Sequence, residues 1–376
     1  RISGTPRRPR HLASTSSVAV RPHRQAYRVA AFSVASEAMH TSQVSCSVGF
    51  TSQDAEAIAE LDKPPAVGDA NVQPTGAAAI RSEEAQGLKL SSKERYVIHT
   101  LAGYKIEGIS VGGQETCVII PQLKIAFDSG RCPQRCVYAD TMCLSHTHLD
   151  HVGGAGCYIA TRSLLALSPP AVLLPASRAV AFEAFISALR ALDGSNLPHR
   201  PVPIAPGGEH RVSKTMVIRP FGTVHPVPSQ GYVVYSTKEK LKAEYSGVTG
   251  VEIRDLKRAG VQVTDTVEVP EVAFTGDTTA DWITSEDPVA VDALRAKLLI
   301  CECTFVDDVV TPEGAREYGH THLNEIAAAA DRFQNDAVLL IHFSARYKAA
   351  DITAALAARL PEQLQKRVTP LLVGFS

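Results

Sequence analysis

Short apolar runs separated by turn residues dominate the chain from Tyr96 onward. The runs are rich in Val, Ile, Phe and Tyr, which favours β-strands. They lie at 96–113, 115–130, 142–148, 171–177, 215–225, 231–237, 271–277, 296–305 and 337–344. Helical spacing of apolar residues predicts helices over 178–194, 322–334 and 351–360, the first of them ending on Gly194 as a C-cap. Strands interspersed with helices predict one α/β domain over 96–376, in which helices cover two sheets.

The first 95 residues lack this pattern of short apolar runs. Residues 1–36 hold seven Arg and neither Asp nor Glu, and they are rich in Ser and Ala. Such a composition is typical of an organelle transit peptide. The alternative is a disordered basic tail that carries no targeting signal. Residues 37–95 show no sustained period and are rich in small and polar residues, which predicts a disordered linker. We expect an organellar protein, in the chloroplast rather than the mitochondrion.

Composition and charge exclude some classes of function. The chain is 45% apolar and 20% charged, as is usual for a globular protein, and no apolar run reaches the ~20 residues that span a bilayer. The eight cysteines are too sparse for a disulfide scaffold and are not spaced as a zinc-finger array, so we expect reduced thiols packed as small apolar groups. Residues 97–376 carry 26 Lys and Arg against 30 Asp and Glu, which excludes a broad surface for polyanions.

The run His146-Thr-His148-Leu-Asp150-His151 is a dense group of titratable residues after an apolar strand over 142–145. Alternation at the strand end places His146 and His148 on one side, where both can bind one ion. The turn that follows brings Asp150 and His151 to the position of a second ion. A lone histidine is usually a surface or core residue, but packing does not require this density beside an apolar strand. Imidazole and carboxylate ligands favour zinc, with manganese or iron as alternatives.

Three later apolar runs also end at potential metal ligands: His225, Asp277 and His342. A carboxylate has two oxygens, so Asp277 can bridge two cations. The predicted ligands are His146, His148, His225 and Asp277 for one ion, and Asp150, His151, Asp277 and His342 for the other. Each ion keeps a position for water, so the pattern predicts a hydrolase with two Zn²⁺ per chain. Asp128 ends another apolar run, and we expect it to support a ligand or a turn.

The run HTHLDH resembles the signature of the metallo-β-lactamase fold. From Ile98 to Phe375 the chain is similar to plant-type short tRNase Z, in the stretches IEGISVGGQETCVIIP, IAFDSGRCP, SHTHLDHVGG, HPVPSQGYVVYSTKEKLK, VAFTGDTT, ECTFVDD, GHTHLNEI and LIHFSARY. No expected ligand position departs from the pattern of that family. The resemblance implies a four-layer αβ/βα sandwich, usually a homodimer, that cuts precursor tRNA after the discriminator nucleotide and leaves a 3′ hydroxyl.

Three residues are expected to act in the reaction: Asp150, Glu302 and His320. Asp150 can bind metal and also orient the attacking water, which predicts that it is the general base. The family pattern implies that His320 protonates the leaving 3′ oxygen and that Glu302 holds the His320 ring. His320 or Thr321 is also a candidate N-cap of the following helix. His322 is equally compatible with packing and with function.

The segment that follows His225 contains the most basic part of residues 96–376. Three of its lysines are predicted to bind RNA phosphates: Lys238, Lys240 and Lys242. The resemblance implies that they belong to a short substrate arm over 236–262, and a solvated helix face is the alternative. Tyr232 and Tyr235 are expected near the substrate. Arg346 is predicted to contact the scissile phosphate, with a structural ion pair as the alternative.

Two other functions remain open. A glyoxalase II-like thioester or ester hydrolase would use the same metal ligands, but it needs neither His320 and Glu302 nor a basic arm. A non-catalytic RNA-processing scaffold has no physical need for a complete ligand set. We therefore predict a zinc-dependent endoribonuclease that processes precursor tRNA, forms a homodimer and does not enter a membrane.

Overall fold

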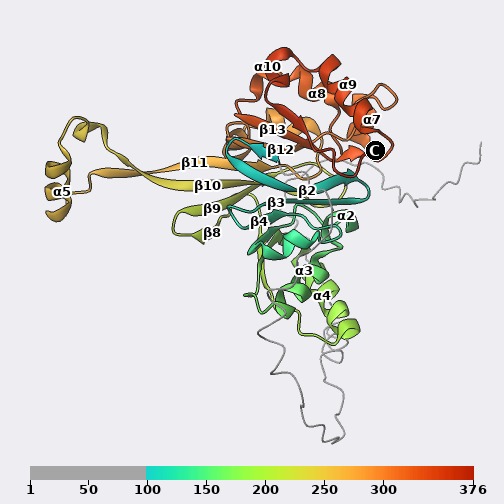
Figure 1. Ribbon diagram of the computed structural model, residues 1–376, viewed down its shortest axis with the longest axis horizontal. Coiled ribbons are helices and arrows are strands. Elements are labelled where there is room, and N and C mark those ends of the chain that lie inside the picture. The colour runs from blue at the N-terminus through green and yellow to red at the C-terminus, as the bar shows by residue number, and fades with distance from the viewer. Residues whose placement is uncertain (1–98) are drawn as a thin grey trace, which may run out of the picture. The chain divides into compact units, whose positions relative to one another are not determined.

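The computed structural model describes residues 99–376, so the predicted transit peptide and linker lie outside the described residues. Two β-sheets pack face to face in the described part (Figure 1). The first sheet has the strand order β1 (His99–Leu101), β2 (Tyr104–Gly112), β3 (Glu115–Ile120), β4 (Ile125–Phe127), β5 (Thr141–Cys143), β6 (Ala171–Pro175) and β7 (Arg200–Ile204), with β14 (Phe343–Ser344) beside β2. The second has the order β15 (Val368–Pro370), β13 (Ala337–Ile341), β12 (Leu298–Glu302), β11 (Thr264–Phe274), β10 (Gln230–Leu241), β9 (Met216–Gly222) and β8 (His210–Ser213).

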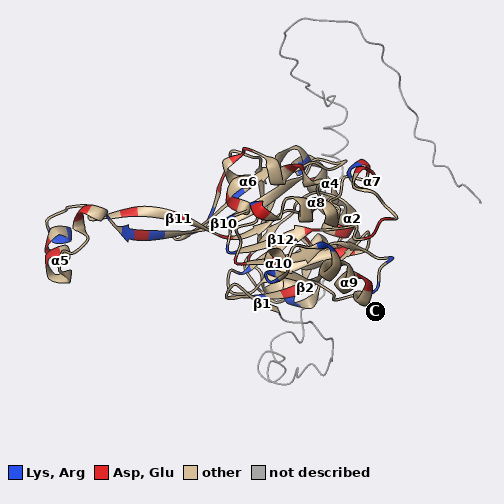
Figure 2. Ribbon diagram, turned by 90° about the horizontal axis from the view of Figure 1, so that it is seen from above, with Lys and Arg blue, Asp and Glu red and all other residues tan. Residues whose placement is uncertain are grey.

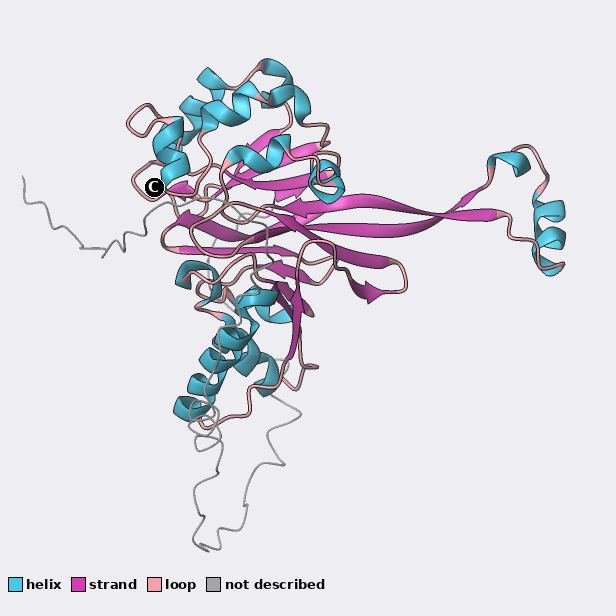
Figure 3. Cartoon of the chain, turned by 180° about the vertical axis from the view of Figure 1, so that it is seen from behind, coloured by secondary structure: helices cyan, strands magenta, loops and turns pink. Residues whose placement is uncertain are grey.

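Helices cover the outer face of each sheet (Figure 3). On the first sheet lie α2 (Leu149–Val152), α3 (Ala155–Leu164) and α4 (Ala179–Asp193), with the 3-10 turns η2 (Gln134–Tyr138) and η3 (Ala176–Arg178). On the second lie η5 (Ala280–Thr284), α6 (Pro288–Ala293), α7 (Pro312–Glu317), α8 (Leu323–Ala328), η6 (Ala330–Arg332), α9 (Ala349–Arg359) and α10 (Glu362–Gln365). The order helix, sheet, sheet, helix confirms the predicted four-layer α/β sandwich.

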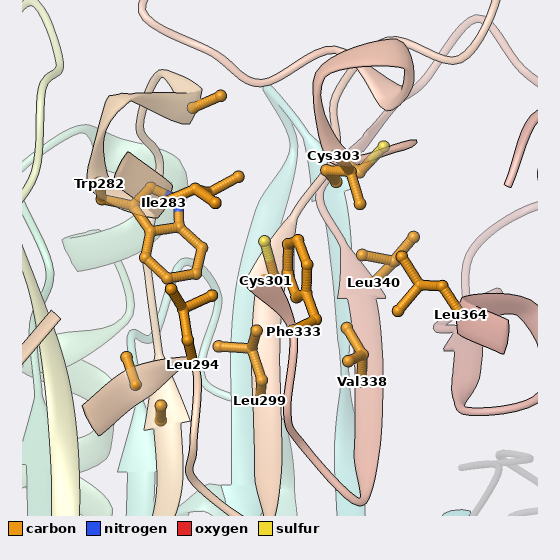
Figure 4. Close-up of a cluster of buried hydrophobic side chains, with 14 of the residues drawn as sticks. Trp282, Ile283, Leu294, Leu299, Cys301, Cys303, Phe333, Val338, Leu340 and Leu364 are labelled. Atoms are coloured by element: carbon orange, nitrogen blue, oxygen red, sulfur yellow. The ribbon is translucent and has the colours of Figure 1, made fainter. Parts of the chain in front are cut away.

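Strand β12 shows how the sequence produces these layers. Successive side chains of a strand point to opposite faces, and every residue of β12 is buried. Leu298 and Ile300 face the first sheet and join the core between the two sheets. Leu299 and Cys301 point the other way, into the core beneath the outer helices, where Phe333 also packs (Figure 4). A strand without polar alternation therefore belongs at the centre of the sandwich.

The predicted helices are confirmed at α4 and α9, whereas the helix expected over 322–334 ends as α8 at Ala328 and is followed by the 3-10 turn η6. The predicted N-cap of α8 is also wrong. Neither His320 nor Thr321 caps α8. The N-cap is His322, whose Nδ1 accepts a hydrogen bond from the backbone N–H of Asn324 at 3.0 Å. The Nε2 of His322 lies 2.7 Å from the carbonyl oxygen of Asp307. Both ring nitrogens are thus used within the fold, which favours the packing role of His322.

Strands β10 and β11 continue beyond the sheet as a long hairpin, and Figure 2 shows it projecting from the body. We call residues 236–269 the arm, since Ser236 pairs with Val269 where the hairpin leaves the sheet. The arm carries η4 (Ala243–Tyr245) and α5 (Gly250–Arg258) at its tip. Tyr232 and Tyr235 are 0% and 2% exposed. Their expected position near the substrate is therefore wrong, because both rings pack in the core at the root of the arm.

Within residues 99–376, no helix has the length and apolar character that a membrane span requires. The cysteines of the same part form no disulfide, and most are buried in the core layers: Cys117, Cys136, Cys143, Cys301 and Cys303. This arrangement agrees with the expected packing of thiols as small apolar groups.

Candidate active site

The predicted metal ligands come together at one end of the sandwich, on loops that follow strands of both sheets. The run from His146 to His151 follows β5 of the first sheet. His225, Asp277 and His342 follow β9, β11 and β13 of the second. Because loops at strand ends are held by a packed scaffold, residues far apart in sequence can share one site.

The first group of ligands consists of His146, His148 and His225. The Nδ1 of His148 lies 3.1 Å from Nε2 of His146 and 3.1 Å from Nε2 of His225. Three nitrogens that surround one tetrahedral zinc at ~2.0–2.1 Å would stand ~3.3 Å apart. The spacing in the structure is therefore that of ligands to a single ion.

The second group consists of Asp150, His151 and His342. The Nε2 atoms of the two histidines lie 3.4 Å apart, and Oδ2 of Asp150 lies 3.7 and 3.8 Å from them. These three donor atoms can also converge on one ion. Their separation is slightly wider than that of the first group.

Asp277 lies between the two groups. Its Oδ2 is 3.2 Å from Nε2 of His151, 3.2 Å from Nε2 of His342 and 3.8 Å from Nε2 of His146. Its Oδ1 is buried and has no hydrogen-bond partner within the described part. A buried carboxylate oxygen without a partner is costly, and a cation on either side would satisfy it. The residues present thus fit a bridged pair of metal ions.

Burial and neighbouring charges shift the pKa values of the predicted ligands. Burial lowers the pKa values of His148 and His225, and burial with neighbouring positive charge holds that of His146 well below its usual range. These three rings are neutral near neutral pH, as a metal ligand must be. Burial would lower the pKa of His151, but the carboxylates of Asp277 and Asp128 outweigh it and raise that pKa well above its usual range. Burial alone would raise the pKa of Asp277, but His151 and His342 outweigh it and hold that pKa well below its usual range. The bridging position therefore carries a negative charge.

Hydrogen bonds behind the ligands fix their orientation. The Nδ1 of His151 lies 2.8 Å from Oδ2 of Asp128, and Nδ1 of His225 donates to the carbonyl oxygen of Gly319 at 2.9 Å. Asp128 is itself fully buried, and its other oxygen accepts the backbone N–H of Ser145 at 2.7 Å. Asp128 and His342 have φ values of 56° and 61°, an unfavourable region for these residues. Such backbone strain is often stored at functional sites.

His320 and Glu302 form a pair at the edge of the ligand set. The Nδ1 of His320 lies 3.1 Å from Oε1 of Glu302, and the His320 ring stacks 5.3 Å from the His342 ring. Glu302 is 0% exposed and accepts hydrogen bonds from the backbone N–H groups of Thr278 and Thr304. Burial opposes protonation of His320, but Glu302 outweighs it and raises the pKa of His320 to about 9. Glu302 therefore favours the protonated form of His320 near neutral pH.

The predicted substrate contacts are spread over two places. Lys240 is exposed and Lys242 half-buried on the arm, whereas Lys238 pairs with the buried Glu271 at 3.2 Å. Arg346 pairs with Asp307 at 2.6 Å. The geometry of Lys238 and Arg346 is thus that of structural ion pairs, and neither joins the metal ligands.

Sequence reasoning missed two hydroxyl groups and one carboxylate that support these elements: Ser145, Thr304 and Glu271. Ser145 directly precedes the histidine run, and Thr304 follows Glu302 by two positions. Adjacency to a predicted ligand or to the predicted catalytic Glu302 was the available signal. Glu271 gave none, because the partners of an isolated acidic residue depend on the fold.

A sandwich of two sheets between helices, with clustered histidines and aspartates at the strand ends, defines the metallo-β-lactamase fold class of metal-dependent hydrolases. No family model matches the chain. It is 50% identical over 275 residues to tRNase Z TRZ1 of Arabidopsis thaliana, covering 73% of this chain and 97% of that protein. It is 43% identical over 297 residues to the chloroplastic tRNase Z TRZ2 of the same plant, covering 79% and 83%. A nuclear ribonuclease Z of Triticum aestivum is 49% identical over 167 residues, covering 44% of this chain and 95% of that protein. The chain belongs to the tRNase Z family, as its motifs predicted.

Proposed function

We propose that the chain is a zinc-dependent endoribonuclease that cuts precursor tRNA after the discriminator nucleotide and leaves a 3′ hydroxyl. The observation that carries this proposal is a complete pair of ligand groups around Asp277 with His320 and Glu302 beside them. Relatives that are 43% to 50% identical and are named tRNase Z support the choice of substrate.

We propose two Zn²⁺ per chain. His146, His148 and His225 would hold one ion, Asp150, His151 and His342 the other, and Asp277 both. Bound zinc would lower the pKa of an attacking water and would offset the negative charge of a phosphodiester. The lowered pKa values of His146, His148 and His225 and the ionised, partnerless carboxylate of Asp277 support this assignment.

The protein's own side chains carry the proton transfers. Asp150 is the proposed general base, since its carboxylate is partly exposed at the mouth of the site and can accept a proton from the attacking water. His320 is the proposed acid, because its raised pKa keeps it protonated until the 3′ oxygen leaves. Glu302 holds the His320 ring in place and stabilises its positive charge.

The arm is the proposed grip for the tRNA. Its exposed cations include Lys240 on β10, and Arg254, Lys257 and Arg258 on α5. Such side chains attract RNA phosphates without reading sequence. Lys238 and Arg346 would reach a phosphate only by exchanging their carboxylate partners, so we place them at the margins of the contact.

One assay tests this function against the two alternatives. Purified protein is offered a 3′-extended precursor tRNA and a glutathione thioester, and zinc is measured on the same sample. We expect a single cut after the discriminator nucleotide, two zinc ions per chain, and loss of cleavage on chelation. Thioester hydrolysis without RNA cleavage would favour the glyoxalase II-like reading, and zinc-free protein that binds tRNA without cutting it would favour the scaffold.

We further propose a transit peptide over 1–36, a linker over 37–95 and a catalytic domain over 96–376. The chloroplastic relative supports a plastid address, whereas the wheat relative is described as nuclear. Fusion of residues 1–95 to a fluorescent protein tests this, and a nuclear or cytosolic signal would contradict it.

A homodimer is also proposed. Three large apolar side chains on α3 and α4 are strongly exposed in the single chain: Leu164, Leu192 and Val180, at 85%, 85% and 68%. A dimer contact over α3 and α4 would remove these side chains from water. Light scattering should give twice the chain mass, and a monomer at micromolar concentration would contradict the proposal.

A further inference from the structure

Two fully buried carboxylates stand behind the active site, and each serves two histidines in the same way. Asp128 contacts His151 directly and reaches His146 through the hydroxyl of Ser145. Glu302 contacts His320 directly and reaches His342 through the hydroxyl of Thr304. The distances agree closely. Carboxylate to hydroxyl is 2.7 Å in both cases, and hydroxyl to Nδ1 is 3.0 and 3.1 Å.

The number of protons fixes the direction of these hydrogen bonds. An ionised carboxylate only accepts, so each hydroxyl donates its single proton to it. The oxygens of Ser145 and Thr304 can then only accept from the imidazole. His146 and His342 must therefore carry hydrogen on Nδ1, which leaves the lone pair of Nε2 facing the ligand groups. In both histidines Nε2 is the atom that approaches Asp277.

We infer that Ser145 and Thr304 are positioning residues, one for each metal ion of the proposed two-zinc site. Each hydroxyl fixes the tautomer of one histidine and connects it to a buried negative charge. Ser145 serves the ion of the first group through His146, and Thr304 serves the ion of the second group through His342. This inference rests on the proposed function, because it assigns support to the metal ligands of the same site.

Removal of each hydroxyl should leave its carboxylate in place. In Ser145→Ala the backbone N–H of residue 145 still donates to Oδ1 of Asp128. In Thr304→Val the backbone N–H of residue 304 and that of Thr278 still donate to Glu302. The substitutions thus break the two relays and little else, and valine keeps the shape of threonine.

The first experiment measures zinc rather than activity. Wild type, Ser145→Ala and Thr304→Val are dialysed against graded chelator, and bound zinc is counted per chain. Loss of a group that supports a metal ligand typically weakens affinity about 10–100-fold. We expect each variant to release one ion at a chelator strength that leaves two on wild type. Anomalous scattering at the zinc edge should locate the loss at the His146 group for Ser145→Ala and at the His342 group for Thr304→Val.

The second experiment reads the tautomers. Long-range ¹H–¹⁵N spectra of metal-free protein labelled on histidine distinguish Nδ1–H from Nε2–H rings. We expect the Nδ1–H form of His146 to be depleted in Ser145→Ala and that of His342 in Thr304→Val. Thr304→Ser restores the hydroxyl and should recover both the tautomer and the zinc.

Thr353→Val on α9 is the control. The hydroxyl of Thr353 donates to the backbone carbonyl of Ala349 at 2.8 Å and not to an imidazole, so zinc and tautomers should stay as in wild type. Wild type without two zinc ions would overturn the proposed metal site itself. Wild type with two zinc ions but variants that keep both, or that lose the same ion, would overturn only the relays.

Discussion

The metal end of the sandwich and the arm are built on opposite principles. At the metal end His146, Asp128 and Glu302 are 0% exposed and Asp277 is 2% exposed, while His148, Asp150 and His225 are half-buried. Along the arm, most side chains outward from Lys238 are exposed or half-buried. The first region is held by hydrogen bonds among buried groups, and the second by backbone pairing and by ion pairs at its root.

This difference separates chemistry from substrate choice. Buried, mutually hydrogen-bonded groups hold reacting atoms in fixed geometry, whereas an extended exposed hairpin offers area to a large ligand. A small phosphodiester such as bis-p-nitrophenyl phosphate needs only the metal end. Under the proposed function precursor tRNA needs both regions, so the pair of substrates reports on each region separately.

The largest effect is expected from Asp277→Asn. The amide removes the negative charge between the two ligand groups and leaves the buried site without its bridge. We expect loss of both zinc ions and a fall on the order of 10³-fold or more in cleavage of both substrates. Metal analysis and the two assays check this.

Asp255→Asn is the control for Asp277→Asn, since Asp255 is an exposed aspartate of α5. It should keep zinc and small-diester hydrolysis. Cleavage at the wild-type rate by zinc-depleted Asp277→Asn would contradict the assignment.

His320→Ala should give the next largest effect, and it should lower the cleavage rates of the two substrates to different extents. A 3′ alkoxide is a poor leaving group and needs a proton, so precursor cleavage should fall about 10²–10⁴-fold. A nitrophenolate leaves without one, so hydrolysis of the small diester should change far less. Both zinc ions should remain, and loss of either ion would mean that His320 is a ligand rather than an acid.

The contrast between the two regions also explains what the sequence revealed. The convergence of the predicted ligands was foreseeable because His146, His148, Asp150 and His151 occur within six positions, and because His225, Asp277 and His342 each end an apolar run. Strong patterns of this kind reflect chemistry that few side chains can perform. Two sheets covered by helices followed from apolar strands interspersed with helical patterns, and the four-layer order followed from the family resemblance.

Other contacts were not predictable, because they depend on distant parts of the chain. Tyr232 and Tyr235 were expected near the substrate, yet both lie in the core. The sequence of a strand does not show which other elements will cover its two faces. Lys238 looked like its neighbours in the basic segment, and its partner Glu271 is 33 residues away. The hydroxyls of Ser145 and Thr304 became meaningful only once the carboxylates behind them were located.

Lysines of the arm provide the third prediction. Lys240→Ala with Lys242→Ala should weaken precursor binding roughly 10-fold. The slope of the logarithm of the binding constant against the logarithm of the salt concentration should fall by up to about two, because up to two phosphate contacts are lost. Hydrolysis of the small diester should not change. The matched control is Lys124→Ala with Lys366→Ala, which removes the same charge from the body. An equal loss of binding in the control would mean that overall charge, and not the arm, attracts the RNA.

The smallest effect concerns the root of the arm, where the two regions join. Glu271 accepts hydrogen bonds from Tyr104, Ser236 and Lys297, and Lys238 pairs with it as well. Burial would raise the pKa of Glu271, but these partners outweigh it and lower that pKa from 4.5 to about 2.

A carboxyl group whose pKa falls on folding stabilises the folded state above its unfolded pKa, and that stabilisation is lost as the pH drops toward the folded pKa. Glu271→Gln should therefore lower stability near neutral pH by about 1 kcal/mol, given that the paired lysines are partly exposed. The difference from wild type should shrink between pH 4.5 and about 2. Melting curves across this range measure it, and a constant difference would show that Glu271 acts by packing. Precursor binding should weaken a few-fold while the small diester is cut normally, because the loosened root leaves the metal end intact.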